Sequence, residues 1–102
     1  MKLTIADRLY IINGLTPSKG SMMTMMVVKD IQKKVEIGQA EVAAIELRDN
    51  EGGGLVWNRE KATEKEVEFT DSEAKVMKDH IDKLSKEENI PMAWLDTCKK
   101  FV

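Results

Sequence analysis

Apolar side chains are densest at residues 22–28, where Thr24 is the only polar residue. Residues 29–35 continue the same helical pattern, but with apolar positions on one side only. A helix of this kind must be covered from more than one direction. It is therefore either the central helix of a small domain or a surface that meets another chain, and Ser21 is expected to cap its start.

A rotation of about 100° per residue divides this helix into a broad apolar face and an opposite side. The broad face comprises Met23, Thr24, Val27, Val28, Ile31 and Val35. Three methionines, Met22, Met25 and Met26, point away from it. In one interpretation the C-terminal helix or a hairpin covers them, since methionine fills irregular gaps in a core. In the other they form a patch for self-association or for a protein partner.

An earlier helix is expected to begin at Thr4, because a threonine followed three residues later by Asp7 forms a capping box. Its apolar stripe is Ile5, Leu9 and Ile12. Asn13 and Gly14 are expected to end this helix before Leu15, because glycine readily adopts the left-handed conformation that closes helices.

In the middle of the chain, apolar and polar residues alternate as they do in half-buried strands. Residues 39–42 can add one helical turn, after which residues 44–48 read as a strand. The glycine-rich segment 49–54 is a strong turn signal, and residues 55–57 supply the second strand of a hairpin. Residues 66–69 alternate again and can add a third antiparallel strand, with Val67 and Phe69 facing inward.

The C-terminal third predicts two helices. Thr70 and Glu73 form a second capping box, so a helix should start at Asp71. Its apolar stripe is Ala74, Met77, Ile81 and Leu84. Pro91 suits the start of a final helix. On that helix the apolar residues are Trp94, Cys98 and Phe101, with Leu95 and Val102 beside them, so we expect the C-terminus to be docked.

Together these patterns predict one α+β domain spanning residues 1–102. It would consist of an N-terminal helix pair, a small hairpin or three-stranded antiparallel sheet, and a C-terminal helix pair. A length of 102 residues, 42% hydrophobic and 33% charged, suits a single folded domain.

A net charge of −2 gives no general attraction to nucleic acid or to anionic lipid. The sequence shows no signal peptide and no membrane-spanning run, and Cys98 is its single cysteine. We therefore expect a cytoplasmic protein that contacts no membrane.

Catalytic patterns are weak. His80 is the only histidine, so a metal site would depend on carboxylates, and Cys98 lies on an apolar stripe where a buried thiol is the usual occupant. Residues 49–52 lack the later ligands of a calcium loop, and residues 52–54 lack the lysine of a phosphate-binding loop. We expect no enzyme, cofactor, metal or small-molecule substrate.

Two helices followed by a hairpin also suggest a winged-helix regulator of nucleic acid, with Lys29, Lys33 and Lys34 as its contacts. However, the second helix is long and apolar, and residues 39–42 carry no arginine or lysine for base readout. Cations near a helix C-terminus are also expected from the helix dipole. Nucleic acid binding is therefore the alternative hypothesis.

Several motifs carry a resemblance to known proteins. They are Leu3 and Thr4 opening a helix, Gly20 before a long apolar helix, Trp57 and Asn58 closing a hairpin, and residues 66–70 leading into a capped helix. In this the chain resembles a family of small uncharacterised proteins encoded by bacteriophages and prophages. The resemblance implies an accessory or assembly component in the bacterial cytoplasm and assigns no catalytic residue.

The function expected from the sequence is that of a non-enzymatic protein-interaction or assembly module. Its candidate contacts are Met22, Met25 and Met26, followed by Trp57. A tryptophan in a strand usually packs inward, but an exposed one would be an anchor of the kind that interfaces favour.

Overall fold

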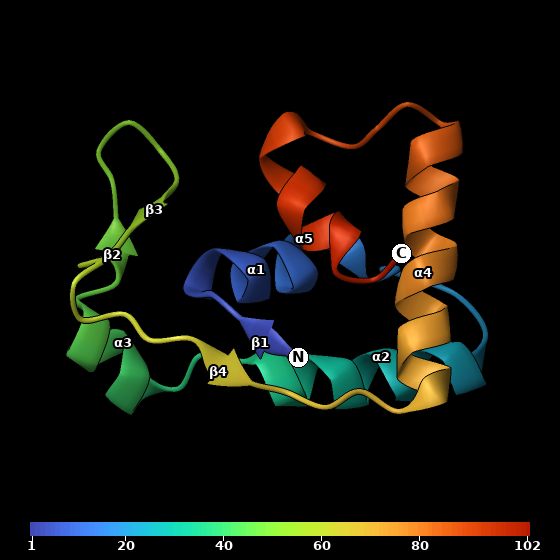
Figure 1. Ribbon diagram of the computed structural model, residues 1–102, viewed down its shortest axis with the longest axis horizontal. Coiled ribbons are helices and arrows are strands. Elements are labelled where there is room, and N and C mark those ends of the chain that lie inside the picture. Colours follow the sequence, from blue (N-terminus) through green and yellow to red (C-terminus); the bar gives the residue numbers. More distant parts are fainter.

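The computed structural model describes all 102 residues and has the α+β architecture that the sequence predicts. Five α-helices and two small antiparallel sheets form a body of 35 × 26 × 22 Å (Figure 1). The helices are α1 (Ile5–Tyr10), α2 (Met22–Val35), α3 (Gln39–Ile45), α4 (Asp71–Lys86) and α5 (Leu95–Lys99). The strands are β1 (Lys2–Leu3), β2 (Arg48–Asp49), β3 (Leu55–Val56) and β4 (Lys65–Glu66). A π-helical segment, η1 (Ile11–Leu15), continues α1, and a 3-10 turn, η2 (Met92–Trp94), precedes α5.

The predicted helix caps are confirmed. The Thr4 hydroxyl accepts from the Asp7 backbone N–H at 3.1 Å, and the Asp7 carboxylate accepts from the Thr4 N–H at 2.9 Å. Thr70 and Glu73 form the same reciprocal pair at the start of α4. Ser21 caps α2 by accepting from the N–H of Thr24. Each cap satisfies backbone donors that a helix leaves free at its N-terminus.

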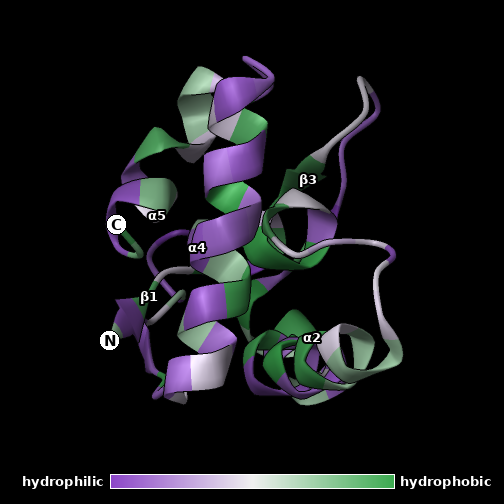
Figure 2. Ribbon diagram, turned by 90° about the vertical axis from the view of Figure 1, so that its right-hand side faces the viewer, coloured by the Kyte–Doolittle hydropathy of each residue, from purple (hydrophilic) through white to green (hydrophobic).

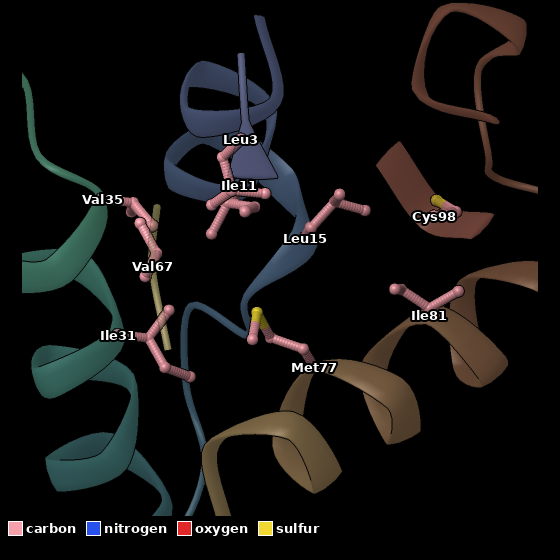
Figure 3. Close-up of a cluster of buried hydrophobic side chains, with 9 residues drawn as sticks. All are labelled: Leu3, Ile11, Leu15, Ile31, Val35, Val67, Met77, Ile81 and Cys98. Atoms are coloured by element: carbon pink, nitrogen blue, oxygen red, sulfur yellow. The ribbon is translucent and has the colours of Figure 1, made fainter. Parts of the chain in front are cut away.

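The core lies where α1 with η1, α2, α4 and α5 meet (Figure 3). Figure 3 shows Ile31 of α2 and Met77 of α4 pointing into the same space below η1. The full cluster is Leu3, Ile11, Leu15, Ile31, Val35, Val67, Met77, Ile81 and Cys98. Trp94 and Phe101 pack against it, so the C-terminal segment is docked, although Leu95 and Val102 are exposed and do not share the predicted apolar face.

The segment predicted as a third strand pairs with the first residues of the chain instead of joining the hairpin. Lys2 lies opposite Glu66, and Leu3 lies opposite Lys65, in antiparallel register. The N-terminal ammonium adds an ion pair to Glu66 at 2.6 Å. Val67 is buried, as predicted, and Phe69 packs on the core. The predicted burial of Val67 is therefore confirmed, whereas the predicted pairing of this segment with the hairpin is wrong.

The strand predicted at residues 44–48 is wrong over most of its length, because α3 occupies residues 39–45. Glu46, in the left-handed conformation, closes that helix. The hairpin itself is confirmed in a shorter form, with Arg48 opposite Val56 and Asp49 opposite Leu55. Gly53 and Gly54 have φ values of 86° and 91°, which glycine adopts without steric cost. In Figure 1, α3 and the hairpin extend to the left of the main helices.

The first helix continues past its predicted end. The sequence predicts that Asn13 and Gly14 close this helix, but the chain remains helical through Leu15 as η1. The need for glycine at this position comes from packing: a Cβ atom on Gly14 would lie 2.1 Å from the Trp94 ring. Glycine is therefore required so that the indole can approach the backbone.

No helix of the structure is both long enough and apolar enough to cross a lipid bilayer.

Candidate interaction surface

The second helix has one buried side and one side that nothing covers. Val28, Ile31 and Val35 are buried against the core. Met22, Met23 and Met26 remain 80%, 78% and 62% exposed. Residues three and four apart are neighbours on a helix, so these three side chains form one continuous patch, which we call the methionine surface. In Figure 2, α2 is seen almost along its axis at the edge of the molecule.

This arrangement corrects two details of the predicted helix. Met23, which the helical pattern places on the buried face, is exposed because the core contacts begin only at Val27 and Val28. Met25, which the same pattern places in the free patch, is half-buried. Of the two interpretations left open by the sequence, coverage within the same chain does not apply to Met22 or Met26.

Trp57 lies apart from the methionine surface and outside the main core. Its ring is half-buried, and the Arg59 guanidinium stacks over it at 5.6 Å from the ring centroid. It lines a hollow of about 320 Å³ against the first turn of α1, where Ile5 and Ala6 supply apolar surface. Trp57 is thus neither the packed core residue nor the freely exposed anchor that the sequence allowed.

The loop that carries Trp57 is fixed by its neighbour Asn58. The Asn58 backbone N–H donates to the Ile45 carbonyl at 2.7 Å, and its side-chain amide donates to Glu46 at 3.3 Å. The Lys61 ammonium adds a 3.0 Å ion pair to the same Glu46 carboxylate. These contacts join the loop after the hairpin to the end of α3.

The three lysines predicted for nucleic acid contact have different surroundings. The Lys34 ammonium is 2.5 Å from the Glu73 carboxylate, and it also donates to the Glu68 carbonyl at 3.0 Å. Lys29 and Lys33 are exposed and line a shallow hollow together with Glu36. The structure therefore brings only two of the three together as free cations.

A buried arginine that the sequence analysis missed organises the end of α2. Arg8 is fully buried, and its guanidinium donates two hydrogen bonds to Glu41, at 2.5 and 2.8 Å. It also donates to the Val35 carbonyl at 3.1 Å and to the Glu36 carbonyl at 2.6 Å. The planar fork of arginine suits this multiple pairing. Arg8 therefore ties α1 to the C-terminal end of α2 and to the first turn of α3.

The adjacent Asp7 ties α1 to the C-terminal segment. Its carboxylate accepts from the Lys100 ammonium at 2.5 Å and from the Thr97 hydroxyl. Burial raises the pKa of Asp7, but the hydrogen bonds from Lys100, Thr97 and Thr4 lower it by more, so the net pKa lies below its ordinary value. Asp7 is thus held as a charged group inside the fold.

The two residues considered for catalysis have different surroundings. His80 is half-buried, and its Nε2 donates to the Gly14 carbonyl at 3.1 Å, since a carbonyl can only accept. Cys98 is buried in the core, and burial raises the pKa of its thiol, which disfavours the nucleophilic thiolate. No three side chains of the histidine, cysteine, aspartate or glutamate type gather as a metal site requires.

Comparison with known proteins gives no relative: no protein-family model, curated protein or solved structure matches the chain.

Proposed function

We propose that this protein works by binding another protein chain through its methionine surface, as an interaction or assembly module without catalysis. The observation that carries the proposal is the exposure of Met22, Met23 and Met26 on a helix whose opposite side belongs to the core. Fully burying one methionine side chain is worth about 1.5–3 kcal/mol. Burial of three neighbouring methionine side chains by a partner would therefore contribute a substantial part of the free energy of binding.

Methionine is well suited to this role. Its unbranched side chain and polarizable sulfur adapt to differently shaped apolar partners. The same helix face continues into Lys29 and Asp30, both exposed, which would supply a polar rim of mixed charge. A standard interface covers about 800 Å² on each partner, more than three side chains provide, so this rim is needed as well.

We further propose that the module is an accessory or assembly component encoded by a phage or prophage and acting in the bacterial cytoplasm. The support for this setting is the resemblance of the sequence motifs described above.

Self-association is the first possibility to test, because it needs only the purified protein. We expect size-exclusion chromatography with light scattering to give a mass above that of one 11.6 kDa chain. The double variant Met22→Glu/Met26→Glu should return a folded species of 11.6 kDa, since a buried unpaired carboxylate opposes association. Met25 is unsuitable for this test because it is half-buried in the fold.

A matched control is available in Met92, which is 90% exposed on η2, away from α2. Met92→Glu should leave the mass unchanged. If the protein is a monomer, it should capture a partner from bacterial extract that the double variant fails to capture and that Met92→Glu retains. A monomer whose captured proteins are identical for all three versions would reject the proposal.

A further inference from the structure

A third hollow lies near the start of α2. This hollow of about 330 Å³ is lined by residues of the connector that follows η1, of the first turn of α2 and of α4. Figure 1 shows the connector and the start of α2 next to α4. Its polar wall consists of Ser18, Lys19, Thr24, Asp79, His80 and Lys83. None of the three residues of the methionine surface lines it, so it is a separate feature.

The charges around this hollow do not balance. Lys19 and Lys83 form no ion pair anywhere in the structure. The single carboxylate in the wall, Asp79, is already paired with the Lys75 ammonium at 2.7 Å. The wall therefore holds two lysines without an ion-pair partner and one carboxylate that is already paired, although Lys83 also borders a neighbouring hollow lined by Asp82 and Glu87.

The uncharged groups of the wall also offer donors. The Thr24 hydroxyl oxygen accepts from the Ser21 hydroxyl at 3.0 Å, so the Thr24 proton remains available. Ser18 is exposed and adds a second hydroxyl. His80 is fixed at the wall because its Nε2 already donates to the Gly14 carbonyl. Two lysines and two hydroxyl-bearing residues thus line one space.

We propose that this hollow binds a small doubly charged oxyanion of the phosphate class. Lys19 and Lys83 would supply the charged donors, and Ser18 and Thr24 would supply hydroxyl donors from the connector and from the first turn of α2. A phosphate group presents several acceptor oxygens around one centre, and lysine binds it as a compact point charge. The binding does not depend on the methionine surface.

The test uses the full chain labelled with ¹⁵N and two probes, inorganic phosphate and sulfate, at constant ionic strength. Constant ionic strength separates binding from general screening of charges. We expect saturable changes in the backbone amide signals of residues 18–24 and 76–83. Changes that rise linearly and spread over every exposed lysine would overturn the proposal.

Single variants locate the site. Lys83→Gln should weaken binding about tenfold, because it removes one charge-assisted hydrogen bond. Lys78→Gln is the matched control: the same helix loses the same charge, but Lys78 does not line the hollow, and binding should change less than about twofold. Both residues are exposed, so both variants should fold, which thermal unfolding would verify.

Equal weakening by the two variants, or none by Lys83→Gln, would also overturn the proposal. The source of the anion is distinguished by adding O-phosphoserine to the titrations. Tighter binding of O-phosphoserine than of inorganic phosphate would support a phosphorylated side chain as the ligand. The reverse order would support the free ion.

Discussion

Asp7 and Lys100 form an ion pair of 2.5 Å that joins the first turn of α1 to the segment after α5. The same ammonium donates to the Lys2 carbonyl at 2.9 Å, so one lysine ties the C-terminal segment to both β1 and α1. Arg8, the next residue, makes the corresponding connection to α2 and α3. Two adjacent charged side chains therefore hold four of the helices around a small apolar core.

Replacement of Asp7 should be costly. Asp7→Asn removes the partner of the Lys100 ammonium and weakens the bond from Thr97. We expect the free energy of unfolding to fall by about 2 kcal/mol as the ion pair is lost. The loss should not be larger, because Lys100 is partly exposed and its ammonium can be hydrated instead. Urea denaturation would measure the loss. The control is Asp96→Asn on α5, an exposed aspartate with no side-chain partner, which should change stability by less than about 0.5 kcal/mol.

Acid should destabilise the protein through Glu73. Burial raises the pKa of this carboxyl, but the hydrogen bonds from Lys34 and Thr70 lower it by more, so its net pKa lies below the ordinary value. Its contribution to stability is therefore complete above the unfolded-state pKa of about 4.3. That contribution is lost as the pH falls through the lower pKa of the folded state.

The pH dependence can be assigned by comparing two glutamates. Glu73→Gln should flatten the decline in the free energy of unfolding measured between about pH 5 and pH 2. Glu68→Gln, at an exposed position where only the backbone carbonyl meets Lys34, should keep the slope of the parent protein. A Glu73→Gln profile parallel to that of the parent would contradict the role given to this carboxylate.

Arg8 should tolerate neither loss of charge nor a change of shape. Arg8→Met leaves the Glu41 carboxylate and two carbonyls without their donor, and we expect a loss of about 3 kcal/mol by chemical denaturation. Arg8→Lys keeps the charge but cannot make the paired bonds, so it should lose about 1–2 kcal/mol. Arg48→Met, at an exposed position in β2, is the comparison and should be nearly neutral. If Arg8→Lys were neutral too, the paired geometry would have no importance.

Gly14 should resist even the smallest side chain. Gly14→Ala places a Cβ atom 2.1 Å from the Trp94 ring, so the indole or the backbone must move, at a cost of about 1–3 kcal/mol. In a Trp94→Leu background the same change should cost much less, which a double-mutant cycle would detect. Gly52→Ala, with nothing within 4 Å of the added atom, should be tolerated. Additive losses in the cycle would show that the indole is not the obstacle.

The thiol of Cys98 should react slowly in the folded protein. It is buried, and burial raises its pKa, so both access and thiolate formation are disfavoured. We expect a disulfide reagent to modify it quickly in urea and slowly in water, at a rate that rises in destabilised variants such as Arg8→Met. Rapid modification in water, independent of stability, would show that Cys98 is accessible.

The features that the sequence predicted correctly are local ones. A capping box needs only two residues three apart, so Thr4 with Asp7 and Thr70 with Glu73 could be recognised without knowledge of the fold. The glycine-rich hairpin turn is equally local. The exposure of Met22 and Met26 could be suspected because they lie off the main apolar stripe, but it was settled only by where the other helices lie.

The features that were missed depend on distant partners. Arg8 lies on the same helix face as Ile5 and Ile11, three residues away on each side, and this was the one signal of its burial. Its partners at residues 35–41 could not be identified from spacing. The pairing of β1 with β4 is likewise set by tertiary packing, since each strand has only two residues.

During synthesis on the ribosome, the partners of Arg8 are made much earlier than the C-terminal partners of Asp7. The partners of Arg8 are synthesised within about 30 residues of it, so α1 can dock on α2 and α3 while the rest of the chain is still being made. Thr97 and Lys100 follow Asp7 by 90 and 93 residues. Until they are synthesised, the Asp7 carboxylate lacks both of these donors, and the Thr4 backbone N–H of the capping box is its remaining partner.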